Sequence, residues 1–119
     1  IRTTVSSQIP RGVLYNGSVR ETLGIINAAN LLIGGDSVYA HASAALNIPT
    51  IVNQGPLWKP FLGVSWDKDL LDNKTNISIL HKELSCRDLL NTGCGSCSDK
   101  SCFEFSVDEV LAEALKVLN

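Results

Sequence analysis

The sequence predicts an α/β fold, a Rossmann-like parallel sheet with flanking helices, and two observations carry this prediction. First, residues 19–53 alternate between helical and strand patterns, in the order helix, strand, helix, strand. Second, the apolar run Leu31–Ile33 stops at Gly34-Gly35, as a core strand does before a tight turn. Alternation over so few residues favours a parallel sheet whose strands are joined by crossover helices.

Each expected helix also has a local signal. Ser18 with Glu21, and Ser106 with Glu109, form S-x-x-E capping boxes, which are typical of helix starts. Apolar residues recur at helical spacing after each box. In chain order we expect a strand and loop over residues 1–15, a helix over 19–29, a strand over 31–33, a helix over 37–46, a strand over 50–53, a loop over 54–67, a strand over 76–80 and a helix over 106–118.

Length and composition limit the class of protein. A chain of 119 residues fits one domain with a modest core. The net charge is −2 and lysines and arginines do not cluster, so we expect no nucleic-acid partner. No apolar run approaches the ~20 residues that cross a bilayer, so we expect no transmembrane segment. The sequence holds no methionine, which suggests part of a longer protein.

The turn after the Leu31–Ile33 run is the candidate binding site. Asp36 or Ser37 can cap the next helix, whose first amides have no partner inside it and can face a diphosphate. Ser37 and His41 lie four residues apart and share one helical face. Open α/β sheets bind ligands at the carboxyl ends of their strands, where this turn lies. The alternative is that the turn only caps a helix, a role in which Asp and Ser are common.

A spaced set of residues continues from this turn: Asp36, Ser37, His41, Ala44, Ala45, Leu46 and Pro49, with Gly55-Pro56 after the next strand. Its order resembles the pattern Asp-Ser/Thr-Gly-x-x-His-x-x-Ala-Ala-Leu-x-x-Pro of the ADP-heptose:lipopolysaccharide heptosyltransferase family, in the half that binds the nucleotide sugar. The resemblance extends upstream to Ser18 and downstream to the C-terminal helix. Val38 departs from the pattern, because the family has glycine there, and valine crowds the approach of a diphosphate to the backbone.

The resemblance implies that residues 1–119 form the donor-binding lobe of a GT-B glycosyltransferase. Such an enzyme transfers a sugar, here expected to be heptose, from an ADP-heptose-like nucleotide-diphosphate donor to a glycan or protein acceptor. Its acceptor lobe and catalytic base are expected upstream of Ile1, so no catalytic residue is assigned in this chain. The implied location is the cytoplasm, with peripheral attachment at the inner membrane as a variant.

The same resemblance implies roles for individual residues, and the implied donor-binding set is Gly35, Asp36, Ser37, Val38, His41, Gly55 and Pro56. Helix amides around Ser37 and Val38 hold the diphosphate, and His41 donates a hydrogen bond to a phosphate oxygen. Asp36 caps the helix or accepts hydrogen bonds from sugar hydroxyls, and Gly55-Pro56 shapes the opposite wall. The alternative is a non-catalytic binding or oligomerisation module in which Val38 marks a lost diphosphate site.

A cysteine-rich segment over residues 86–102 is the second candidate site. Cys86, Cys94, Cys97 and Cys102 follow the spacing C-x7-C-x2-C-x4-C. Four thiolates suit a tetrahedral zinc or iron ion, which would be structural because no coordination position stays open. Two disulfides in an oxidising compartment, or free thiols in the cytosol, are the alternatives. Some autotransporter heptosyltransferases of similar sequence hold iron with four cysteines, which favours the metal.

Overall fold

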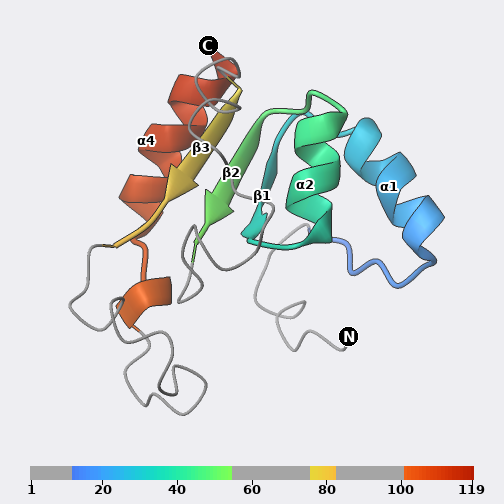
Figure 1. The fold of residues 1–119 in the computed structure, drawn as a ribbon, viewed down its shortest axis with the longest axis horizontal. Coiled ribbons are helices and arrows are strands. Elements are labelled where there is room, and N and C mark those ends of the chain that lie inside the picture. Colours follow the sequence, from blue (N-terminus) through green and yellow to red (C-terminus); the bar gives the residue numbers. More distant parts are fainter. Residues whose placement is uncertain (1–11, 55–75, 83–100) are drawn as a thin grey trace.

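The computed structural model describes residues 12–54, 76–82 and 101–119 (Figure 1). In this part of the chain the elements are α1 (Val19–Asn27), β1 (Leu32–Gly35), α2 (Val38–Ala45), β2 (Thr50–Asn53), β3 (Ile77–Leu80), the 3-10 helix η3 (Ser101–Phe103) and α4 (Val107–Leu118). The strands form a parallel sheet in the order β1-β2-β3. The α/β class and the parallel sheet predicted from the sequence are therefore confirmed.

One face of the sheet packs against α2. Val52 of the central strand is fully buried and packs with Ala40 and Ala44 of α2. Side chains of the neighbouring strands join this cluster: Leu32, Ile77 and Ile79. Small residues on α2 let the helix approach the sheet closely. α1 packs against α2 and contributes one buried residue, Ile26.

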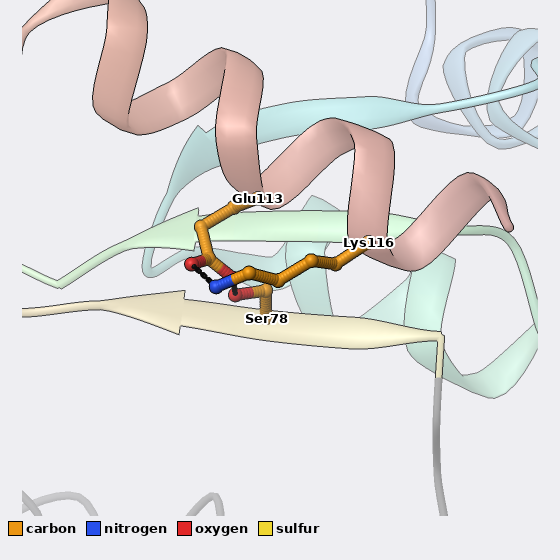
Figure 2. A network of polar contacts seen from close by, with 3 residues as sticks. All are labelled: Ser78, Glu113 and Lys116. Atoms are coloured by element: carbon orange, nitrogen blue, oxygen red, sulfur yellow. Dashed lines mark hydrogen bonds and ion pairs between the residues drawn. The ribbon is translucent and has the colours of Figure 1, made fainter.

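The opposite face carries α4. Side chains alternate along a strand, so Ser78 points away from its neighbours Ile77 and Ile79 and toward α4. The Ser78 hydroxyl donates to the carboxylate of Glu113, which also pairs with Lys116 (Figure 2). This contact and the buried Ala114 hold α4 over β2 and β3. Helices therefore cover both faces of the sheet.

α2 ends in a Schellman motif that explains Asn47. The amide of Ile48 donates to the Ser43 carbonyl at 3.0 Å, and the amide of Asn47 donates to the Ala44 carbonyl at 3.1 Å. Asn47 takes the left-handed conformation that this motif requires, with φ 61°, which asparagine tolerates better than most residues. Its side chain accepts a hydrogen bond from Asn76 at 3.1 Å, just before β3. The helix end is thereby tied to the third strand.

The structure corrects two details of the sequence prediction. β1 does not stop before the two glycines: Gly34 pairs with Val52 and Gly35 with Asn53, so the strand runs to Gly35. The apolar residues of α4 do not all face the core, because Leu111, Leu115 and Leu118 are each more than half exposed. Both capping boxes are confirmed, since each serine hydroxyl accepts an amide hydrogen bond from its glutamate and each carboxylate accepts one from its serine.

None of the helices in the described ranges could span a bilayer. The longest, α4, has 12 residues and carries four charged side chains, Asp108, Glu109, Glu113 and Lys116.

Candidate functional site at the carboxyl end of the sheet

The three α-helices of the described ranges begin at the end of the sheet where the strands end (Figure 1). Their first turns differ. In α1 and α4, a serine and a glutamate satisfy backbone amides through complete capping boxes. In α2, Ser37 holds the N-cap position with extended backbone, but its side chain makes no capping hydrogen bond, and the first turn has no acidic residue. Of these three helix N-termini, only that of α2 lacks a side-chain cap from its N-cap residue, so its first backbone amides can bind an anion.

Asp36 and His41 lie together at the start of α2. The Asp36 carboxylate Oδ1 is 3.3 Å from His41 Nε2, with side chains 12% and 34% exposed. Asp36 therefore contacts His41 across the first turn, while Ser37 takes the N-cap position. A neutral imidazole has one N–H. If His41 donates its Nε2–H hydrogen bond to Asp36, it has a second N–H to offer only after it is protonated. Hydrogen bonding from His41 to a phosphate then requires the imidazolium or the other tautomer.

The remaining residues of the turn leave room above the backbone. The Val38 side chain is 65% exposed, so it stands at the rim of the site and not in the core. Among the described residues, a Cβ atom built on Gly35 would meet only the backbone carbonyl oxygen of Asn53, at 4.0 Å. Gly55 and Pro56, the expected opposite wall, lie outside the described residues.

A pocket of about 410 Å³ opens beside this turn. It lies between the segment that precedes α1, one side of α1, and the first turn of α2. Its lining residues are Tyr15, Asn16, Gly17, Thr22, Ile25, Ile26 and Tyr39. Tyr39 belongs to α2 and follows Val38 directly, so the pocket adjoins the candidate anion site. Two aromatic rings, two isoleucines and a few polar groups are a typical lining for an organic ligand.

Gly17 is needed for the position of the Tyr15 ring. A Cβ atom on Gly17 would lie 2.1 Å from the Tyr15 hydroxyl oxygen. The Tyr15 hydroxyl also reaches the Glu21 carboxylate, whose pKa is lowered mainly by hydrogen bonds from the Ser18 hydroxyl and amide and to a smaller degree by Tyr15. The capping box thus fixes one wall of the pocket. Sequence analysis missed both tyrosines, because isolated tyrosines follow no periodicity or motif.

The end of β2 contributes two further polar residues that sequence analysis also missed. Gln54 is 4% exposed, and its backbone amide donates a hydrogen bond to the Leu80 carbonyl at 2.8 Å. The side-chain oxygen Oδ1 of Asn53 is buried and has no hydrogen-bond partner among the described residues. The sequence signal that could have identified them is the pair of consecutive polar residues directly after the buried apolar residues of β2.

The predicted metal site lies mostly outside the described residues, because Cys86, Cys94 and Cys97 fall in residues 83–100. Cys102 is described: it lies in η3 and is 9% exposed. Within the described ranges, His, Cys, Asp and Glu form no cluster of three or more that suits a metal ion. The four-cysteine site therefore stays a prediction.

Comparison with known proteins gives no family for this chain. No family model, curated protein or solved structure matches it. The heptosyltransferase resemblance rests on the sequence pattern alone.

Proposed function

We propose that this chain binds a nucleotide-diphosphate sugar at the start of α2, as the donor-binding lobe of a GT-B glycosyltransferase. The observation that carries the proposal is the β1–α2 turn at the carboxyl end of a parallel sheet, with the Ser37 hydroxyl not used as a cap. Helix amides that lack an internal partner, together with the helix dipole, favour a diphosphate at this position.

The pocket between α1 and α2 gives the nucleotide a second contact. Tyr39 links the two places, because it lines the pocket and belongs to the first turn of α2. Tyr15 comes from the segment that precedes α1, and it adds a second aromatic ring to the pocket lining. Aromatic side chains stack on planar bases, so the pocket suits the base of a nucleotide whose diphosphate faces Ser37 and Val38.

In the complete enzyme this lobe would act by position and charge. Amides at the start of α2 would offset the negative charge that builds on the leaving nucleotide diphosphate as the sugar moves to an acceptor hydroxyl. His41, when protonated, would add a hydrogen bond to a phosphate oxygen. The general base and the glycan or protein acceptor would belong to a separate acceptor lobe.

Isothermal titration with ADP-, UDP- and GDP-sugars tests the proposal. The wild-type chain should bind at least one of them, and Asp36→Ala and His41→Ala should each weaken that binding by about tenfold, the worth of one hydrogen bond to a charged group. Asp108→Ala is the matched control, since Asp108 is an exposed carboxylate in the first turn of α4. Unchanged affinity in both site variants, or no binding by the wild type, would exclude this site.

We also propose that Cys86, Cys94, Cys97 and Cys102 hold a structural zinc or iron ion. Burial of Cys102 supports a structural role rather than an exposed reactive thiol. Elemental analysis of protein purified without added metal should find about one ion per chain, with thiols that react only after chelation or unfolding. Absence of both metal and reactive thiols would show disulfides instead.

A further inference from the structure

The contact between Asp36 and His41 sets the charge at the start of α2. The imidazole Nε2 of His41 lies 3.3 Å from the Asp36 carboxylate oxygen Oδ1, and the two side chains are 34% and 12% exposed. A carboxylate beside a neutral imidazole gives the pair one negative charge, whereas a carboxylate beside an imidazolium gives a neutral pair. Histidine changes between these two forms between about pH 5 and 8. One proton therefore decides the net charge at this turn.

The same proton decides how well the turn accepts an anion. The backbone amide of His41 already donates to the Ser37 carbonyl, so the amides that an anion can use are those of the first turn before it. The contact with Asp36, which precedes Ser37, places the imidazole at this same end of α2. A diphosphate on these amides is within about one helical turn of His41, close enough for their charges to interact without direct contact. Its negative charge opposes Asp36 and favours the imidazolium.

His41 is the group near α2 whose charge changes in this pH range, among the described residues. α2 packs chiefly against β1, β2 and α1. β1 and β2 contain no ionisable side chain. α1 contributes Arg20, which stays protonated, and Glu21, whose carboxylate is held by the amide and hydroxyl of Ser18. A proton linked to anion binding at this turn is therefore assigned to His41.

We infer that the site binds its nucleotide-diphosphate sugar in the form in which His41 is protonated, so that binding takes up a proton from solution. This rests on the proposed function. Because the bound protein holds more protons than the free protein, the affinity falls as pH rises. One linked proton limits this fall to about tenfold per pH unit, and we expect a fall of at least about threefold between pH 6 and 8.

Isothermal titration with ADP-, UDP- and GDP-glucose tests the inference. The diphosphate of these probes is esterified at both ends, so it does not itself titrate near neutral pH. The wild-type chain is titrated at pH 6, 7 and 8, and at pH 7 in both HEPES and Tris, whose heats of ionisation differ. Proton uptake makes the measured heat of binding depend on the buffer, and both this dependence and the fall in affinity with pH are expected for the wild type.

Two histidine variants assign the proton. The side chain of His41→Gln donates an N–H but cannot be protonated, so its affinity should be independent of pH and its heat of binding independent of the buffer. His81→Gln is the matched control and should keep both dependences, because His81 is exposed, follows β3 and is the only other histidine of the sequence.

Two results would overturn the inference while leaving the proposed function standing. One is a wild-type chain that binds with the same affinity from pH 6 to 8 and the same heat in both buffers. The other is proton uptake that persists in His41→Gln or is lost in His81→Gln. A wild-type chain that binds none of the three probes would instead refute the proposed function, and the linked proton with it.

Proton NMR of the two imidazole rings gives a readout that needs no change at position 41. A saturating probe should raise the pH at which the His41 ring is half-protonated and leave that of His81 unchanged, with the spectrum of His81→Gln assigning the two signals. A midpoint of His41 that is the same with and without the probe would overturn the inference.

Discussion

Two buried hydroxyls that join α2 to β2 give the sharpest test of the packing. Ser43 Oγ and Thr50 Oγ1 are 2.7 Å apart, and both residues are 0% exposed. The Thr50 hydroxyl also donates to the Ile48 carbonyl at 2.7 Å. A hydroxyl has one proton, so Ser43 must be the donor to Thr50. The order of donation therefore runs from Ser43 through Thr50 to Ile48.

This order makes the two positions unequal. Ser43→Ala removes one donor and should cost about 1 kcal/mol in free energy of unfolding. Thr50→Val keeps the shape but removes two hydrogen bonds and leaves the Ser43 proton buried without an acceptor, at a cost of about 3 kcal/mol. In the double variant no hydroxyl is left unpaired, so its cost should fall to about 2 kcal/mol. Ser43→Ala should therefore partly rescue Thr50→Val.

Urea denaturation followed by circular dichroism on the wild type and the three variants measures these differences. The decisive comparison is between Thr50→Val and the double variant. A double variant that is less stable than Thr50→Val, by the full cost of Ser43→Ala, would show that the two changes are additive and refute the assigned direction of donation.

Three further predictions concern the pocket and α4. Gly17→Ala should displace the Tyr15 ring, because the new methyl would stand 2.1 Å from the Tyr15 hydroxyl oxygen, and should weaken nucleotide binding in titration. Gly24→Ala is the control, because this helical glycine has open space around it, and it should leave nucleotide binding unchanged. Lys116 lowers the pKa of Glu113, so the stability from this carboxylate is present above about pH 4.5 and is lost as pH falls through the lower folded pKa. Acid titration of Glu113→Gln should then show a flatter decline than the wild type. Ser18→Ala should cost about 1 kcal/mol by urea denaturation; no loss would mean that its capping bond contributes nothing.

The sequence predicted the elements well where a residue type has a local cause. Each S-x-x-E box marked a helix start correctly, because serine and glutamate satisfy the first amides without help from the rest of the fold. The strand over 50–53 was also placed correctly. Gly34 and Gly35 were read as a turn, yet they belong to β1, since pairing with the central strand outweighs the low strand propensity of glycine.

The candidate site was only partly predictable, because its contacts join residues through tertiary structure. Asp36 and His41 were found by motif, but their mutual contact depends on the path of the first turn of α2. Tyr15 and Tyr39 meet at one pocket only because α1 packs against α2. Periodicity likewise identified the apolar side of α4 without indicating how much of it the sheet covers.

The Schellman turn at Asn47 bears on the order in which the chain folds. The contacts of β1, α2 and β2 with one another lie within residues 32–53, so closing this unit costs little loop entropy. β3 instead begins at residue 77, much farther along the chain. It docks through the Asn76 side chain on Asn47 and the Asn76 carbonyl on the Thr50 amide. The unit that holds the candidate site is thus expected to form early. β3 would pair with β2 afterwards, when Asn47 at the end of α2 is already in place to accept the hydrogen bond from Asn76.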